Sequence, residues 1–259
     1  DEARKFWLAA LKDPSTSPKQ QADIAYVLVD NEFKDDAEPV FVRLALNPVL
    51  TAKERSDILT ELLYIWGPRP EPAQMQWIEK RYVESAEKGK KYWASQISGL
   101  GTEDYLISFA ERHPESIVIS PEMADAYFEA LADAGQMRSK ADYYIVGARS
   151  SGKTDLLRKY AQVAEEKGYK REARNAYSAI AEIQTSDYAA ERSSGLMAFD
   201  LADYSASKQF LGDYIKSYES SGTNDPQAYV AYFYYGEIMR RDGDLANAKP
   251  YYVKTLALM

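Results

Sequence analysis

Residues 228–258 read AYVAYFYYGEIMRRDGDLANAKPYYVKTLAL, a stretch that predicts two amphipathic helices joined by a tight turn. Residues three and four positions apart share one face of a helix. The first helix has such a face at Tyr232, Tyr235, Gly236 and Met239. The second has one at Ala248, Tyr252, Thr255 and Leu256. Gly243 and Asp244 lie between the two faces and favour a chain reversal.

The same pattern occurs again in the residues that precede this stretch. Turns are indicated at Gly135, at Gly168 and around Ala202, and they lie 33 and 34 residues apart. The step to the turn at Gly243 is longer because a loop predicted at Ser220–Asp225 adds a few residues. A fixed period of this length is typical of helical repeat proteins.

The N-terminal half keeps the period with a weaker pattern. Second helices of hairpins are indicated by small and bulky residues four positions apart, at Ala3 and Trp7, Ala37 and Phe41, and Ala73 and Trp77. The first two end at Pro14 and Pro48, which are 34 residues apart, and the third follows a helix breaker at residues 67–70. We therefore expect one unpaired second helix followed by seven hairpins, degenerate over residues 1–116 and clearer over 117–259.

This pattern resembles the tetratricopeptide (TPR) repeat. The matching features are the small residues on the first helix, the turn, and a later A-x3-Y pair such as Ala173 and Tyr177. The resemblance implies an all-α fold, a right-handed TPR-like α-solenoid of about seven helical hairpins. It also implies that residues 1–259 form a single superhelix, and we expect the chain to be a fragment of a longer protein.

Composition argues against several classes of function. The formal net charge is −8, and no Lys/Arg cluster offers the basic face that a nucleic-acid partner requires. The chain lacks a run of 18 apolar residues, so we expect it not to span a membrane. With no Cys and a single His, His113, thiolate metal sites and a Ser-His-Asp arrangement are not expected. We therefore predict a protein that is not an enzyme and that needs no cofactor or metal.

One short motif favours a different function. Gly147–Thr154 fits the P-loop pattern G-x4-G-K-[ST], and residues 143–146 (YYIV) precede it as a strand would. A P-loop would hold phosphates with backbone N–H groups and the Lys153 ammonium. The repeat period instead places this stretch at the end of a second helix, with residues 150–153 as a loop and Ser151 or Thr154 as a helix N-cap. We prefer the structural interpretation and keep a P-loop nucleotide-binding protein as an alternative.

The resemblance also implies a concave groove lined by the first helix of each hairpin. The residues predicted to face it are Asp125, Glu129, Arg158, Gln162, Arg192, Leu196, Phe199, Phe233, Glu237 and Arg240. Arg158 and Arg192 occupy equivalent positions and can hold a carboxylate or an extended peptide. The other interpretation is a solvated face with ion pairs to Glu129 or Glu165. The Lys and Asn pattern with which some TPR proteins bind a carboxylate is not matched.

The 21 tyrosines allow a further alternative. Most of them, Tyr143 and Tyr144 included, fall at core spacing, so packing is the preferred interpretation. The surplus aromatic rings suit a carbohydrate-binding groove around residues such as Phe199 and Phe233.

We therefore predict a non-catalytic scaffold that binds a protein or an extended peptide in its concave groove. The acidic charge and the missing Cys make the chain similar to TPR regions of bacterial envelope proteins, including the periplasmic TPR region of exopolysaccharide export outer-membrane proteins. That similarity implies a periplasmic location, with a cytoplasmic one as the alternative. It also implies polysaccharide or envelope assembly components as further partners.

Overall fold

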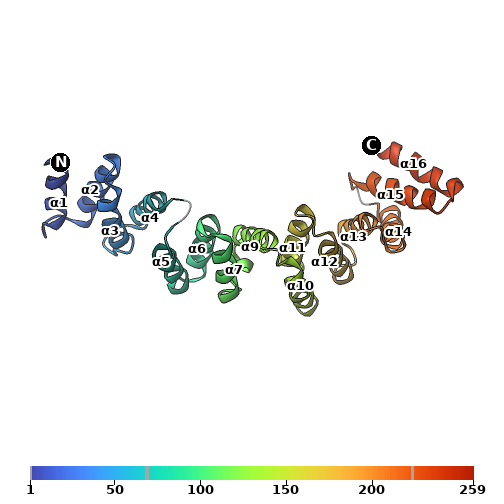
Figure 1. The fold of residues 1–259 in the computed structure, drawn as a ribbon, viewed down its shortest axis with the longest axis horizontal. Coiled ribbons are helices and arrows are strands. Elements are labelled where there is room, and N and C mark those ends of the chain that lie inside the picture. Colours follow the sequence, from blue (N-terminus) through green and yellow to red (C-terminus); the bar gives the residue numbers. More distant parts are fainter. Residues whose placement is uncertain (1, 68–69, 223–224) are drawn as a thin grey trace. The chain divides into compact units, whose positions relative to one another are not determined.

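A computed structural model describes residues 2–67, 70–222 and 225–259 of the chain. These residues form sixteen helices and no strand, so the all-α prediction is confirmed for them (Figure 1). Part of the predicted breaker, residues 68–69, and part of the predicted loop, residues 223–224, lie outside the described residues.

The chain divides into two compact units. The first comprises residues 1–84 with 99–102, and the second comprises residues 85–98 with 103–259. The helices of the first unit are α1 (Glu2–Lys12), α2 (Pro18–Asp30), α3 (Lys34–Leu44), α4 (Ala52–Trp66) and α5 (Pro72–Glu84). The expectation of a single superhelix over residues 1–259 stays a prediction.

Capping residues explain where helices of the first unit begin. Ser17 and Thr51 each accept a hydrogen bond from a backbone N–H of the first turn, while a side chain from that turn bonds back to the cap. This reciprocal arrangement satisfies two N–H groups that the helix leaves without partners. Further along, the Trp66 indole and the Gln74 amide both donate to Glu38, at 2.7 and 3.0 Å, and tie α3, α4 and α5 together.

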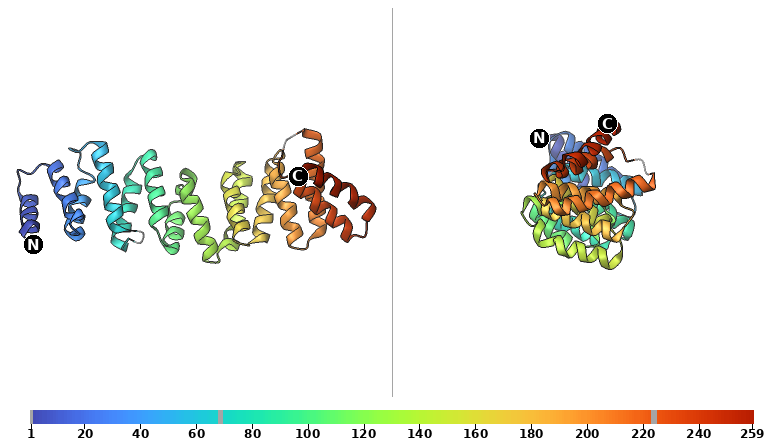
Figure 2. Two further views of the ribbon diagram at one scale, coloured as in Figure 1. Left: turned by 90° about the horizontal axis from the view of Figure 1, so that it is seen from above. Right: turned by 90° about the vertical axis from the view of Figure 1, so that its right-hand side faces the viewer.

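The second unit holds the remaining helices, apart from the last two residues of α6. They are α6 (Glu87–Leu100), α7 (Glu103–Arg112), α8 (Ser116–Ile119), α9 (Pro121–Asp133), α10 (Met137–Ser151), α11 (Asp155–Glu166), α12 (Lys170–Ile183), α13 (Tyr188–Asp200), α14 (Tyr204–Ser221), α15 (Ala228–Arg241) and α16 (Leu245–Leu258). Successive long helices from α11 to α16 lie side by side and reverse direction (Figure 2). Without the four-residue α8, fifteen described helices remain, which fits one helix followed by seven pairs in chain order. Close packing within a pair is present for α2 with α3, α11 with α12, α13 with α14 and α15 with α16, and the total of seven hairpins stays a prediction.

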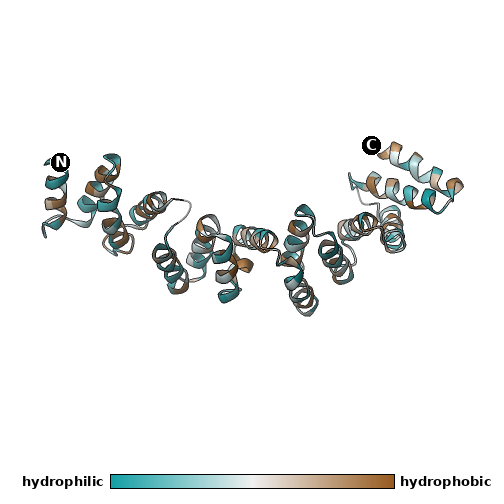
Figure 3. Ribbon diagram, viewed as in Figure 1, coloured by the Kyte–Doolittle hydropathy of each residue, from teal (hydrophilic) through white to brown (hydrophobic). Residues whose placement is uncertain are grey.

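Each long helix of the second unit from α9 onward buries one face and leaves another to solvent. Figure 3 shows hydrophobic and hydrophilic residues alternating around most helices. The largest fully buried side chains of this unit include Phe128, Tyr160 and Tyr214. Removing an aromatic or aliphatic side chain of this size from water contributes about 1.5–3 kcal/mol to folding. Packing of amphipathic faces therefore holds the hairpins together.

The predicted turns are confirmed by their backbone angles. Gly135, Gly168 and Gly243 have φ values of 70°, 81° and 81°. Ala202 has a φ of 59°, although a Cβ disfavours this left-handed region. Each of these residues follows the first helix of a pair and reverses the chain.

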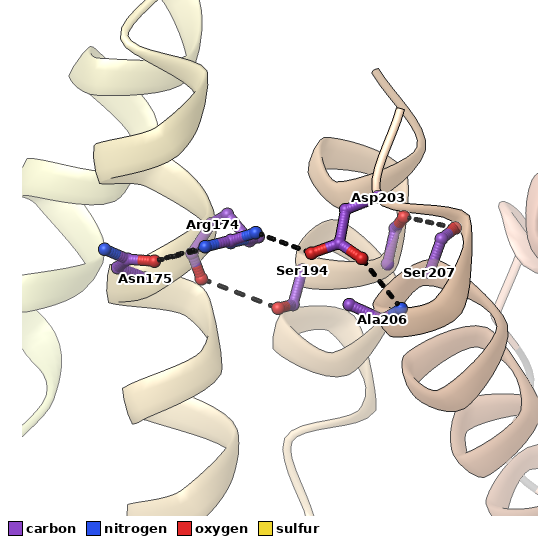
Figure 4. A network of polar contacts seen from close by, with 7 residues as sticks. Arg174, Asn175, Ser194, Asp203, Ala206 and Ser207 are labelled. Carbon is purple, nitrogen blue, oxygen red and sulfur yellow. Dashed lines mark hydrogen bonds and ion pairs between the residues drawn. The ribbon is translucent and has the colours of Figure 1, made fainter. Parts of the chain in front are cut away.

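Ion pairs between neighbouring hairpins follow the repeat period. Lys159 pairs with Asp125 at 2.6 Å, and Lys208 pairs with Asp242 at 2.8 Å, each across 34 residues. Arg174 reaches Asp203 at 3.1 Å, and the same carboxylate accepts the Ala206 N–H at the start of α14 (Figure 4). Residues one period apart therefore occupy neighbouring positions in space.

Two helices are longer than the sequence predicts. Helix α10 continues through Ser150 and Ser151, and α14 continues through Ser220 and Ser221, where loops were expected. Each ends at a glycine in the left-handed region, Gly152 and Gly222, with φ values of 69° and 64°. A glycine at this position stops a helix efficiently, so the predicted loops begin at these glycines.

None of the helices within the described ranges combines the length and the apolar character that crossing a bilayer requires.

Candidate functional site

An open groove of about 1090 Å³ lies in the second unit, around helix α10. Its walls are α8, the beginnings of α9 and α11, and the C-terminal half of α10. These parts meet at the ends of the hairpins where a second helix connects to the next first helix. We call this site the α10 groove.

The surface of the α10 groove is mostly apolar. Val118, Tyr143 and Val146 line it with 72%, 65% and 59% of their surface exposed. Ile117 and Leu157 lie beneath them and are buried. A cluster of exposed apolar side chains around a concave site is typical of a surface that another molecule covers.

The pattern of ion pairs between hairpins is interrupted at the α10 groove. Arg158 and Arg192 each reach an aspartate near the beginning of the next hairpin, Asp187 and Asp225. The residue 34 positions before Arg158 is Ala124, which lines the groove. A methyl group cannot make the equivalent ion pair, and Ala124 is buried at the edge of the groove.

The junction after α10 shapes one end of the groove. Ser151 donates its hydroxyl to the Gly147 carbonyl at 2.8 Å, within the last turns of α10. Gly152 then ends the helix, and the buried Thr154 occupies the N-cap position of α11 without a side-chain capping bond. Only three residues separate the two helices, which holds their ends close together.

Acidic and basic groups are balanced at the rim. Glu115, Lys159 and Arg158 are held in ion pairs with Lys90, Asp125 and Asp187. Asp155 lies in the first turn of α11, where its charge complements the helix dipole. Asp142 and Lys153 are in no ion pair among the residues that the structure describes. Because acidic and basic groups balance, the rim has no excess of positive charge with which to attract a polyanion.

The buried tyrosine next to the groove stays neutral. Burial raises the pKa of Tyr144, and the neighbouring Tyr127 raises it further. Tyr144 lines the groove, and its ring packs against Phe128 at 5.1 Å and Tyr160 at 5.6 Å. The floor of the α10 groove is therefore uncharged near neutral pH.

The P-loop motif does not have P-loop geometry in this structure. Residues 143–146, which would have to form a strand, lie within α10, as do residues 147–151. The part of the chain that the structure describes contains no strand from which a phosphate-binding loop can start. The motif nevertheless contributes to the α10 groove, because Gly147, Ser151 and Lys153 line it.

Two of the residues predicted to face a concave groove, Arg158 and Gln162, line the α10 groove. The other eight lie elsewhere on α9, α13 and α15: Asp125, Glu129, Arg192, Leu196, Phe199, Phe233, Glu237 and Arg240. Their role in binding stays a prediction.

The two equivalent arginines need a correction. Arg158 pairs with Asp187 and Arg192 with Asp225, and among the described residues neither makes the ion pair with Glu129 or Glu165 that the alternative of a solvated face included. Arg192 is only 8% exposed. Both guanidinium groups therefore connect one hairpin to the next, and Arg192 is not displayed on a solvated face. The observed partners belong to the following hairpin, whereas Glu165 lies on the same helix as Arg158 and Glu129 lies on α9 of the preceding hairpin.

The aromatic residues predicted to bind sugar are partly used in packing. Phe199 packs against Tyr234 and Tyr204, with ring centres 4.7 and 5.3 Å away. Phe233 is more exposed and lies 6.2 Å from the Tyr252 ring. Tyr252 in turn donates to Glu237, which also pairs with Arg240. Tyr143 was expected in the core and is instead largely exposed in the α10 groove.

Val118, Tyr143 and Val146 are groove residues that the sequence analysis did not single out as binding residues, and Gly147 was named there only as part of the P-loop pattern. Helix α10 buries Ala141, Tyr144 and Ala148 on one face, which is enough for a hairpin. Tyr143, Val146 and Gly147 form a second row on the same helix. A second apolar row beyond the one that packing requires is the signal that points to this site.

Comparisons with known proteins add no relative. No protein-family model matches the chain. No curated protein matches its sequence either. The resemblance to TPR repeats therefore rests on the residues themselves.

Proposed function

We propose that this chain is a non-catalytic scaffold that binds a segment of a partner protein in the α10 groove. The observation that carries the proposal is the exposure of Val118, Tyr143 and Val146 around one concave site. Covering apolar surface contributes about 25 cal/mol per Å² before the costs of association are counted. A neutral floor and a balanced rim favour a protein segment over a polyanion.

We infer that the array is a right-handed TPR-like α-solenoid. The order of one helix followed by seven pairs supports this, as do the ion pairs that join residues 34 positions apart. In such an array each hairpin touches its neighbours and leaves extended surfaces for binding. The predicted concave residues, such as Glu129 and Phe233, would provide a second surface for a protein or an extended peptide.

We further propose a place in the bacterial envelope, in support of exopolysaccharide export. The absence of Cys and the resemblance to periplasmic TPR regions support this proposal. Locating the full-length protein by cell fractionation tests it. A periplasmic protein is expected, and a protein confined to the cytoplasm would contradict the envelope role without affecting the binding function.

Binding can be tested with two matched substitutions. Val146→Asp places a charge in the α10 groove, and Val253→Asp places the same charge on α16, at a valine that is 57% exposed. Both valines are on helix surfaces, so both variants are expected to fold. A display library of random peptides is selected on the wild-type protein, and binding of the selected peptides to the two variants is then measured.

The outcome separates three functions. Peptides that bind the wild type and Val253→Asp but lose at least about tenfold in affinity for Val146→Asp support the proposal, since tenfold corresponds to about 1.4 kcal/mol. Peptides that bind both variants equally contradict it. A rise in melting temperature with ATP and Mg²⁺ that Lys153→Ala abolishes would favour the nucleotide alternative. Shifts in NMR signals of Phe199 and Phe233 with polysaccharide fragments would favour a carbohydrate-binding groove.

A further inference from the structure

Glycines inside the helices of the second unit have a shared role in packing. A Cβ built on Gly195 of α13 would lie 2.6 Å from the Leu211 side chain of α14. A Cβ on Gly236 of α15 would lie 3.1 Å from the Tyr252 ring of α16. In both cases the missing side chain leaves a hollow on one helix, and the next helix fills it with a large side chain.

Gly147 of α10 differs from these two glycines, because it is exposed on a second helix and no described side chain covers it. It lies well inside the helix, and a Cβ built on it would meet no side chain or neighbouring backbone within 4 Å. Glycine inside a helix costs roughly 0.5–1 kcal/mol relative to alanine, so a hollow here has no benefit for α10 alone. The buried neighbour Ala148 already provides the small residue on the packed face of α10.

The surroundings of Gly147 are those of a helix-packing site. Tyr143 lies one turn before it, and Val146 lies beside it, both exposed in the groove. A ridge of side chains on an approaching helix fits between such residues when a small residue lies at the centre of the contact.

We propose that the α10 groove takes a single α-helix of a partner protein, whose leucine or aromatic side chain packs onto Gly147 between Tyr143 and Val146. The inference rests on the proposed function and names the chemistry of the partner. It assigns to the partner the role that Leu211 and Tyr252 have within this chain.

The charges of the groove orient that helix. Asp142 lies five residues before Gly147, and Lys153 lies six residues after it. A helix that runs antiparallel to α10 places its N-terminal end near Lys153 and its C-terminal end near Asp142. Acidic residues are favoured at helix N-termini and basic residues at C-termini, so the complementary charges also stabilise the partner helix itself. We therefore expect an acidic residue before the knob and a basic residue after it.

The experiment uses the peptides of a random display library of about 16 residues, long enough for four helical turns. They are selected on the wild-type protein, and their affinities are compared for Gly147→Ala and Gly147→Leu. Leucine at position 147 fills the hollow from within, and alanine fills it only slightly. Because a Cβ at this position meets no neighbour, both variants are expected to keep the fold, which thermal unfolding checks.

We expect selected peptides to carry a large apolar residue within a helical pattern and to lose at least about tenfold in affinity for Gly147→Leu. Alanine is expected to weaken binding by a smaller factor. Lys153→Glu should weaken peptides with an N-terminal acidic residue, and replacing that residue by lysine should restore binding.

Failure of the helix-packing inference can be distinguished from failure of the proposed function. Peptides that depend on Val146 but bind Gly147→Leu as well as the wild type would overturn the helix-packing inference and leave the proposed function standing. Selected peptides that are extended or proline-rich would do the same. Peptides that show no dependence on Val146 would contradict the proposed function, and this inference would fail with it.

Discussion

The guanidinium of Arg192 meets the carboxylate of Asp225, 33 residues further along the chain, in a contact that is largely closed to solvent. The Tyr214 hydroxyl donates to the same carboxylate at 2.7 Å, and Arg192 also donates to Gln227 at 2.8 Å. Arg192 belongs to α13, and Asp225 precedes α15, so this contact connects consecutive first helices. Several other ion pairs also join residues about one repeat period apart, and in this one both side chains are largely buried.

Arg192→Met should destabilise the second unit by about 1.5–3 kcal/mol, the usual contribution of hydrogen bonds to charged groups. The substitution keeps an apolar stem and leaves Asp225 without its main cationic partner. Arg149→Met is the matched control, because Arg149 pairs with Glu182 across the same 33 residues on an open surface. Such surface pairs contribute about 0–1 kcal/mol. Equal losses in urea unfolding would contradict the structural role of Arg192.

Asp225 should make part of the stability depend on acid. Burial acts to raise its pKa, but hydrogen bonds from Tyr214, the Gln227 backbone and Arg192 outweigh it, and the pKa is lowered below its ordinary value. A lowered pKa in the folded state gives stability that is present above the ordinary pKa, near 4, and is lost as pH falls through the lowered one.

The measurement is urea unfolding of the wild type and Asp225→Asn from neutral to acid pH. The wild type should be more stable near pH 7, and the difference should shrink as pH falls from about 4 toward the lowered pKa of the folded Asp225 carboxyl. A difference that stays constant over this range would mean that the charge of Asp225 is unimportant.

Much of the fold is predictable from the sequence because turns and helix faces are local signals. Gly135, Gly168 and Gly243 reverse the chain where their spacing predicts, since a left-handed backbone favours glycine. Ala202 has the same conformation without being a glycine, and only the period identifies it. The ends of α10 and α14 were placed too early because serines are common in loops.

The site was less predictable because its contacts are not local. The partners of Arg158 and Arg192 lie about one repeat away, and opposite charges at that spacing were the signal to look for. Ala124 takes the position one repeat before Arg158 and makes no such ion pair. The absence of a contact leaves no pattern in the sequence that could be recognised. The short α8 is also a break in the period, so the repeat alone does not predict it.

Glu191 should have an effect of the opposite sign to that of Asp225. One of its carboxylate oxygens is buried and has no hydrogen-bond partner within the part of the chain that the structure describes. Burial raises the pKa of Glu191, and the nearby Asp213 and Asp187 raise it further. A raised pKa gives stability that is present below the ordinary value and is lost as pH rises through the raised one. The charged form is therefore unfavourable at neutral pH.

Glu191→Gln should raise the melting temperature at pH 7. The gain in unfolding free energy should be less than about 1 kcal/mol, because solvent screens the charge of a partly exposed group. The gain should disappear near pH 4, where the wild-type carboxyl is protonated. Glu129→Gln removes a charge from an exposed position on α9 and serves as the control. A gain for both variants at pH 7 would indicate an effect of net charge rather than of burial.

The same substitution at two helical glycines should change stability in opposite directions. At Gly195 a new Cβ would come within 2.6 Å of the Leu211 side chain and 3.2 Å of its backbone nitrogen. Leu211 is fully buried and cannot move away freely, so Gly195→Ala should cost about 1–3 kcal/mol through overpacking. At Gly147 a Cβ meets nothing, and Gly147→Ala should stabilise α10 by about 0.5–1 kcal/mol.

The change in stability caused by Gly236→Ala should fall between those of the other two variants. A Cβ there would meet the edge of the Tyr252 ring at 3.1 Å, and a ring near the surface can tilt away. Urea unfolding of the three variants, each compared with the wild type, ranks them. The order Gly147→Ala, then Gly236→Ala, then Gly195→Ala from most to least stable is expected. A loss at Gly147 as large as that at Gly195 would mean that its hollow is already filled within the chain. The surface on which a partner helix is proposed to pack would then not be free.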